Sequence, residues 1–333
     1  MKFGFGHVPA ENYKNFVELV QLAEELGFDF AWVPDQTFYR DPYVIMAALA
    51  LSTSRINIGL GVTNPYTRHP AMAARAVGAL NEMAPGRIHL GIGAGNRKEL
   101  IHPLGLDGSH PGEKCREMAE IVKGLLSGKE IQHEGEHFLA RGVVLNFDAG
   151  PEIPVYIAGR GALVLQAAGQ SADGAIIGGL CTPKGIDYAL RHIEYGASLS
   201  GRDMRRMEIV SWVTIQITTR REQVLENIRP VVAHIVGGAP LEVLEAVDLP
   251  MDIVDKIKGA YTREGSAEAA KFISEEFIDA FTIIGDSQSC INRIQALSDA
   301  GVTQLSMLMP PAGVQDQQKI INRFAEVILP EFK

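Results

Sequence analysis

The sequence predicts an α/β fold, namely a (β/α)8 TIM barrel. Strand-like and helix-like segments alternate along nearly all of the 333 residues, and eight of these segments are strand-like. The eight are short and continuously apolar, as parallel strands covered on both faces should be. Glycines also gather where several of these strands end, at the rim that carries the functional residues of a barrel.

The individual elements follow from periodicity and turn residues. Residues 2–8 are expected as the first strand, and residues 12–26 as a helix because Phe16, Leu19, Val20 and Ala23 share one helical face. Further strands are expected at residues 29–33, 55–60, 87–92, 153–157, 175–177, 208–218 and 304–309. Further helices are expected at residues 71–83, 162–170, 186–199, about 221–277, 287–300 and about 314–327.

Two segments are too long for ordinary barrel loops. They lie near residues 96–150, in particular 96–112 with 127–150, and at residues 229–276. Long insertions in barrels usually sit over the active-site rim as lids or subunit contacts. No linker or repeat separates the segments, so residues 1–333 are expected to form a single domain.

Composition narrows the class of protein. The net charge of -9 disfavours nucleic acid and anionic membrane surfaces as partners. The three cysteines are widely spaced without a CxxC pattern, which argues against a disulfide framework and structural zinc. The chain begins as a strand and contains no apolar run of about 20 residues, so we expect a cytoplasmic protein with no membrane span.

No metal site is expected. His133 and His137 are four residues apart but are separated by Glu-Gly-Glu, which indicates a solvated hairpin rather than a helical metal pair.

The candidate ligand site comprises the residues that follow the strands. The glycine-rich ends suggest a planar ligand across the barrel mouth, where the backbone approaches the ring closely. The positions are Gly6 and His7, Asp35 and Gln36, Gly61 to Asn64, Gly93 to Arg97, Ala158 to Gly161, and Gly178 and Gly179.

Residues 158–164 (AGRGALV) form the best anion site in the sequence. A strand runs through a glycine loop into a helix, so free N–H groups and the helix dipole point at one place, and Arg160 adds a positive charge. The alternative is a tight loop with a solvent-facing arginine. Asp35 follows a mostly apolar strand, where an ionised carboxylate needs donors, either for function or to cap a turn.

These residues together resemble the bacterial-luciferase-like superfamily, and within it the branch that uses the deazaflavin coenzyme F420. The likeness is greatest to the methylenetetrahydromethanopterin reductases and covers nearly the whole chain. The most specific motif is GVTNPY at residues 61–66; the others are MKFG at 1–4, AWVPD at 31–35, LGIG at 90–93, PVYI at 154–157 and GVTQ at 301–304.

The resemblance implies a set of site assignments. The bond between Gly61 and Val62 would be a non-prolyl cis peptide that presses on the back of the deazaflavin ring. Asp35 would contact the ring system, and Asn64 the ring or its ribityl chain. Arg160, Gly161, Leu163 and Val164 would hold the phosphate. The expected cofactor-binding set is Asp35, Gly61, Val62, Thr63, Asn64, Gly93, Ala94, Gly95, Gly159, Arg160, Gly161, Leu163 and Val164.

The chain departs from the family pattern at its proton-handling positions. The reductases have acidic residues where this chain has Gly6 and Asn96, and the related sugar-phosphate dehydrogenases have His and Glu at Gln36 and Asn96. Asp35, Gln36 and Asn96 are the candidate catalytic positions, but a neutral amide cannot act as a general base near pH 7. His7 and Arg97 are the candidate replacements.

Three functions remain open from the sequence. The first is an F420-dependent oxidoreductase that moves a hydride between the coenzyme and an imine, alkene, carbonyl or alcohol, within a homodimer as is common in the family. The second is an FMN-dependent monooxygenase of the same fold that uses O₂. The third is a flavin-binding accessory protein without catalysis.

Overall fold

The protein is a closed barrel of eight parallel strands, as the sequence predicts. The computed structural model describes residues 1–10, 12–36, 38–309 and 313–332. The barrel strands are paired in the order β1-β2-β3-β4-β7-β8-β9-β11, and β11 pairs with β1 to close the barrel. Their bounds are β1 Lys2–Gly6, β2 Phe30–Val33, β3 Asn57–Thr63, β4 Ile88–Gly93, β7 Val155–Gly159, β8 Gly174–Gly178, β9 Glu208–Ile217 and β11 Gln304–Leu308.

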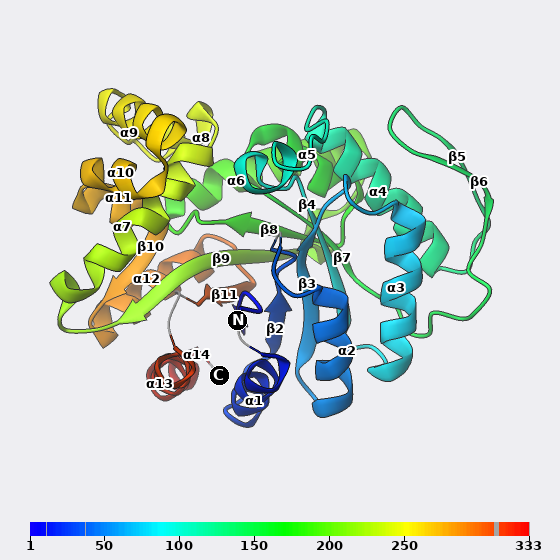
Figure 1. The fold of residues 1–333 in the computed structure, drawn as a ribbon, viewed down its shortest axis with the longest axis horizontal. Helices are drawn as coiled ribbons and strands as arrows, with labels where there is room; N and C mark the ends of the chain where they lie inside the picture. The colour runs from blue at the N-terminus through cyan, green and yellow to red at the C-terminus, as the bar shows by residue number, and fades with distance from the viewer. Residues whose placement is uncertain (11, 37, 310–312, 333) are drawn as a thin grey trace.

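Helices surround this barrel (Figure 1). The helices that connect successive barrel strands are α1 Tyr13–Glu25, α2 Pro42–Ser52, α3 Pro70–Met83, α4 Pro111–Leu126, α5 Ala162–Ser171, α6 Pro183–Leu199 and α12 Ser287–Asp299. The chain ends with α13 Val314–Val327 and α14 Leu329–Phe332. Asn12 caps α1 by accepting hydrogen bonds from the backbone N–H groups of Lys14 and Asn15.

The elements that the sequence did not predict include helix α2 and strand β10 (Thr282–Gly285). Helix α2 is apolar on every face, so it lacks the one-sided periodicity that identifies a surface helix. Strand β10 has only four residues, and it pairs with the second half of β9 while β8 pairs with the first half. Strand β9 can accept both neighbours because it is ten residues long.

The hairpin of the first long segment and the helices of the second lie on opposite sides of the barrel in Figure 1, whereas the start of the first segment contacts two helices of the second. The first contains the short π-helix η1 (Arg97–Ile101), α4, and a hairpin of β5 (Ile131–Glu134) and β6 (Leu139–Val143), which confirms the expected hairpin. The second contains α7 Arg221–Gly238, α8 Leu241–Ala246, α9 Met251–Glu264, α10 Ser266–Ala269 and α11 Glu275–Phe281. In the part of the chain that the structure describes, no helix is long and apolar enough to cross a membrane.

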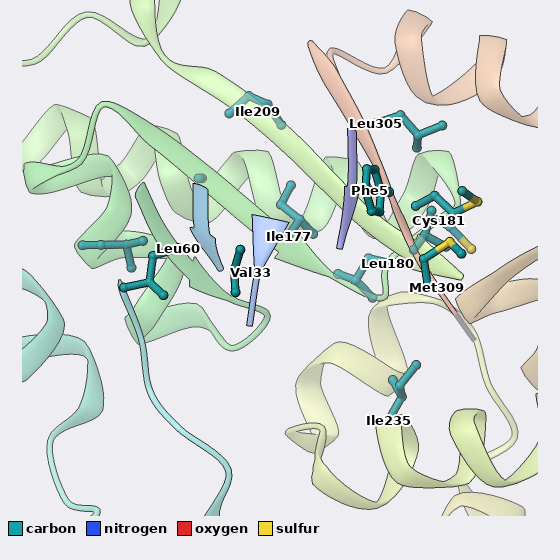
Figure 2. Close-up of a cluster of buried hydrophobic side chains, with 14 of the residues drawn as sticks. Phe5, Val33, Leu60, Ile177, Leu180, Cys181, Ile209, Ile235, Leu305 and Met309 are labelled. Carbon is teal, nitrogen blue, oxygen red and sulfur yellow. The ribbon is translucent and has the colours of Figure 1, made fainter. Parts of the chain in front are cut away.

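The hydrophobic core has two parts. The larger lies between strands and helices, and Figure 2 shows part of it, including Phe5, Leu60 and Ile177. A smaller cluster of Phe30, Trp32, Tyr156, Ile176 and Val210 is packed against Trp212. The three cysteines are buried and free, which confirms that no disulfide framework holds the chain.

Candidate active site

The carboxyl ends of the barrel strands open into a cleft of about 910 Å³. The expected cofactor-binding and catalytic residues line this one cleft: Asp35, Gln36, Gly61, Val62, Thr63, Asn64, Gly93, Ala94, Gly95, Asn96, Gly159, Arg160, Gly161, Leu163 and Val164. Gly6, His7 and Gly179, which were also expected at this rim, are not part of its lining. Residues from the helical insertion complete the opposite wall, so the insertion covers the rim as expected.

The peptide bond between Gly61 and Val62 is cis, which confirms the expectation from the family resemblance. It lies at an irregularity in the pairing of β3 with β4, between Leu60 and Thr63. A Cβ added at Gly91 or Gly93 would lie 2.7 or 2.5 Å from a methyl group of Val62. Two glycines of β4 therefore make room for the Val62 side chain behind the cleft wall.

Two tryptophans explain other glycines that the sequence analysis attributed to a flat ligand. A Cβ at Gly59 would lie 2.2 Å from the ring of Trp32, and a Cβ at Gly61 would lie 2.6 Å from the ring of Trp212. A Cβ at Gly6 would lie 2.1 Å from the Trp212 ring. These glycines are therefore needed for internal packing, which corrects that part of the prediction. The same contact explains why this chain has no acidic side chain at residue 6: the Trp212 ring occupies the space.

Helix α5 begins at the other end of the cleft, after the Gly159–Gly161 loop. Gly161 has no side chain to cap the helix, so the first N–H groups face the cleft wall without an intrahelical partner. One of them, from Ala162, donates to Oε1 of Glu242 at 3.0 Å, and the Tyr188 hydroxyl donates to the same oxygen at 3.1 Å. A carboxylate of α8 thus occupies the place where an anion is favoured.

Arg160 does not point into solvent, which excludes the alternative considered for this loop. Its Nη1 donates to the carbonyl oxygen of Ile235 on α7 at 3.2 Å, and burial lowers the pKa of the guanidinium to about 10. The side chain remains positively charged at neutral pH, and it adds a positive potential to the α5 end of the cleft.

Asp35 lies at the end of β2 and its environment disfavours ionisation. Burial raises the pKa of its carboxyl group, and the nearby negative charge of Asp41 raises it further. A hydrogen bond from Thr63 Oγ1, at 3.4 Å, and the charge of Arg68 partly oppose this effect. Asp35 is thus a carboxyl group with a raised pKa that lines a cleft. Shifted pKa values of this kind are typical of functional sites.

The structure reveals a titratable cluster that sequence reasoning missed. Glu99 on η1, His234 on α7 and Tyr261 on α9 all line the cleft. His234 Nδ1 lies 3.8 Å from Glu99 Oε1 and 3.2 Å from the Tyr261 hydroxyl. Burial lowers the pKa of His234, and the charge of Glu99 partly offsets that shift. The three residues come from segments far apart in the sequence, and no spacing in the chain connects them.

The predicted catalytic residues Gln36 and Asn96 hold this cluster in place. Gln36 Nε2 donates to Glu99 Oε2 at 2.8 Å. Asn96 caps η1, because its Oδ1 accepts hydrogen bonds from the backbone N–H groups of Lys98 and Glu99. The Nδ2 atom of Asn96 then lies 3.2 Å from His234 Nε2. An amide nitrogen only donates, so Nε2 accepts and Nδ1 carries the proton.

The other candidates have different surroundings. Asn64 closes a turn, because its Oδ1 accepts from the backbone N–H groups of Tyr66 and Thr67. His7 is buried and stacked on Phe16, with ring centroids 5.3 Å apart, and it does not belong to the cleft lining. Arg97 does line the cleft, and its Nη2 donates to the carbonyl oxygen of Gly108 at 3.4 Å.

Comparisons with known proteins support one family. The family model described as luciferase-like monooxygenase matches residues 2–304. The chain is 36% identical to a 5,10-methylenetetrahydromethanopterin reductase of Archaeoglobus fulgidus, over the full length of both proteins. It is 28% identical to an F420-dependent glucose-6-phosphate dehydrogenase of Rhodococcus erythropolis, over 100% of this chain and 98% of the relative.

A solved structure supports the same family. The coenzyme F420-dependent tetrahydromethanopterin reductase of Methanopyrus kandleri superposes with a TM-score of 0.87 at 28% identity. The match covers 100% of this chain and 99% of the reductase.

Proposed function

This chain belongs to the luciferase-like monooxygenase family, and we propose that it is a coenzyme F420-dependent oxidoreductase. It transfers a hydride between the deazaflavin and a small organic substrate that carries an imine, alkene, carbonyl or alcohol. The three relatives described above, whose names specify F420 or a methanopterin substrate, match the whole chain, and the identity with the Archaeoglobus fulgidus reductase exceeds one third.

The observation that carries this proposal is the polarity of the cleft. One end has the N–H groups of Leu163 and Val164 beside Arg160, which fits a phosphate, while the Ala162 N–H donates to Glu242. The middle has an uncharged wall formed by the Gly61–Val62 peptide and the ring of Trp212, which fits the face of a planar ring. An elongated group with a flat head and an anionic tail therefore matches the residues present.

The barrel side of the cleft would orient the coenzyme. When bound, the deazaflavin supplies the hydride chemistry at its C5. Gly61 and Val62 would support one face of the ring, which would leave the other face to the substrate. The N–H groups of Leu163 and Val164 hold the phosphate, while Asp35, Thr63 and Asn64 border the ring and the chain attached to it.

We propose that Glu99 and His234 handle the proton that accompanies hydride transfer. Both face the cleft, and Gln36 and Asn96 fix their orientation through hydrogen bonds. Because burial lowers the pKa of His234, its imidazole is neutral at pH 7 and can accept a proton at Nε2 as a general base. Gln36 and Asn96 are therefore positioning residues rather than acid–base catalysts.

The alternative is an FMN-dependent monooxygenase, because the same cleft accepts a flavin phosphate. Titration of the purified apoprotein with F420 and with FMN separates the two. We expect stoichiometric binding of F420 and hydride transfer without O₂ uptake, first tested with methylenetetrahydromethanopterin and glucose 6-phosphate, the substrates in the relatives' names. Stoichiometric FMN binding with substrate-dependent O₂ uptake would establish the alternative.

A binding protein without catalysis is the remaining function. Tight F420 binding with no turnover across imine, alkene, carbonyl and alcohol substrates would favour it. The titratable cluster of Glu99, His234 and Tyr261 argues against it, because these side chains have no evident structural reason to face the cleft.

We also propose that the chain works as a homodimer joined through α2 and α3. Val44 and Leu51 are exposed one heptad apart on α2, and Met72 and Met83 are exposed three turns apart on α3. Light scattering should give twice the chain mass, and Leu51→Glu should shift the protein to monomer. A monomeric wild-type protein at micromolar concentration contradicts this proposal.

Two further assignments complete the proposal. We infer a single domain, because the segments at residues 96–150 and 229–276 both contribute residues to the same cleft. We infer a cytoplasmic location, because the three cysteines are free and buried as in a reducing compartment.

A further inference from the structure

We propose that His110, Glu113 and His137 bind one divalent transition-metal ion, with Zn²⁺ the best fit to the ligand atoms. The three side chains converge at the start of α4 and the turn of the β5–β6 hairpin, outside the set of residues that line the cleft. The sequence predicted no metal site because His133 and His137 are not placed as a helical metal pair. The structure instead brings together His137 and two residues of another element.

The spacing of the ligand atoms matches a tetrahedral site. His137 Nε2 lies 3.0 Å from Glu113 Oε2, and His110 Nδ1 lies 3.3 Å from the same oxygen. All three ligand atoms lie within 4.8 Å of one another. Bonds of about 2.0–2.1 Å at tetrahedral angles separate two ligand atoms by about 3.3 Å. Both distances to Glu113 Oε2 are close to that value before any side chain moves.

The backbone holds the ligands in this arrangement. His110 immediately precedes α4 in a left-handed conformation, with φ 50° and ψ 46°, and Glu113 follows within the first turn. His137 lies in the hairpin turn, where Glu117 Oε2 accepts from the N–H groups of His137 and Phe138 at 3.3 and 3.2 Å. Glu117 is itself buried on α4, so one helix positions all three ligands. Supporting hydrogen bonds of this kind are typical around metal ligands.

The types of the three ligand atoms indicate which metal ions fit the site. Two imidazoles and one carboxylate suit Zn²⁺ and its neighbours in the first transition series, whereas Ca²⁺ and Mg²⁺ prefer oxygen ligands. The His137 side chain is 12% exposed, but His110 and Glu113 are more than half exposed, so an ion can enter from solvent. Three protein ligands leave the fourth position for water.

The ion would fasten the hairpin to the start of α4. That start adjoins the cleft, because Gly108 and Pro111 belong to its lining. Without the ion, the hairpin is joined to α4 by the hydrogen bonds of buried Glu117 and by one hydrogen bond between His137 and Glu113, and the ion would add a further link near the surface. The site is therefore a structural metal site on a functional rim, and hydride transfer does not need it.

The test is Zn²⁺ binding to protein stripped with a chelator. Calorimetry should show one ion per chain, with binding that weakens as pH falls because only neutral imidazole binds metal. Zn²⁺ should raise Tm by on the order of 2–4 °C. Co²⁺ in place of Zn²⁺ should give the visible absorption of a tetrahedral site. Each of His110→Ala, Glu113→Gln and His137→Ala should weaken binding at least about tenfold.

The controls separate this site from general affinity for metal. Glu120→Gln lies two turns along α4, and His192→Ala lies on α6; neither should change Zn²⁺ binding. Far-UV circular dichroism and F420 titration of each variant show that it is folded. Zn²⁺ binding that survives His110→Ala and Glu113→Gln, or that disappears in His133→Ala instead, overturns the proposal. An apoprotein that takes up no Zn²⁺ also overturns it.

Discussion

The barrel rim and the inserted segments build opposite sides of the cleft by different means. The barrel side offers backbone and small side chains: the cis peptide at Gly61 and the helix start at Gly161. The inserted segments offer titratable side chains: Glu99, His234 and Glu242. In the function proposed above, the barrel side would bind the coenzyme and the inserted segments would supply the groups that handle the proton. Changes on the two sides should therefore separate binding from turnover.

The largest effect is expected for Glu99→Gln. The variant keeps the shape of the side chain but removes its charge and its capacity to accept a proton. Turnover should fall by about 10²- to 10⁴-fold, the usual contribution of a general acid or base, while the Kd of F420 stays within about threefold. Steady-state kinetics and coenzyme titration measure the two quantities. Loss of coenzyme binding in this variant would show that Glu99 helps to bind the coenzyme instead of handling the proton.

The pH dependence of kcat tests whether Glu99 and His234 act as a pair. Burial lowers the pKa of His234, and the charge of Glu99 offsets part of that shift. Removing the charge lowers the pKa further, so the acidic limb of the kcat profile should move to lower pH in Glu99→Gln. Glu264→Gln, an exposed change near the end of α9, should leave the profile unchanged. A shift of that limb to higher pH contradicts the pairing.

On the barrel side, Gly161→Asp should weaken F420 binding by about 100-fold. The new carboxylate stands against the phosphate at the start of α5 and adds to the negative charge of Glu242, whose Oε1 lies 3.9 Å from the new Cβ. Gly161→Asn has nearly the same volume without the charge, so it should cost far less affinity. Equal loss in both variants would mean that size rather than charge matters. Unchanged affinity in both would place the phosphate elsewhere.

The sequence predicted the barrel and the residues of its rim because both leave local signals. Apolar strands, amphipathic helices such as α1 and the turn residues after each strand are readable within a few positions. The expected cofactor-binding residues line the cleft for this reason, whereas Gly6, His7 and Gly179 are not part of its lining. Local signals do not, however, show why glycine occurs at a given position. Gly59 and Gly61 are small because Trp32 and Trp212 fill the adjacent space, and Trp212 lies some 150 residues away in the chain.

The residues that the sequence could not reveal come from the insertions. His234 sits within a long helix, Tyr261 within another, and Glu99 in a turn whose π-helical form depends on its Asn96 cap. Each is an ordinary polar residue in its own segment. Only the tertiary fold places them around one cleft, as it also places His137 beside His110 and Glu113.

A smaller effect of opposite sign is expected for Glu242→Gln. The amide oxygen can still accept from the Ala162 N–H and the Tyr188 hydroxyl, but the negative charge at the phosphate end disappears. A charge at about 4 Å in water contributes about 1 kcal/mol, so F420 should bind roughly fivefold more tightly and with a steeper salt dependence. Glu245→Gln, on the same helix, is the matched control. Weaker binding in Glu242→Gln would show that the carboxylate helps to hold the coenzyme.

The smallest effect concerns stability, and it tests whether Asp35 is kept for function. Burial raises the pKa of Asp35, so the folded state binds more protons than the unfolded state above the ordinary value of 3.8. Stability is therefore lost as pH rises through that window, and Asp35→Asn avoids the loss. The variant should be more stable at pH 7 by about 1 kcal/mol in urea unfolding, with no gain below pH 3.8, while F420 binds at least about tenfold more weakly. Asp187→Asn, an exposed change on α6, should alter neither. A variant that loses stability at pH 7 would show that the carboxylate is there to support the β2 end rather than the ligand.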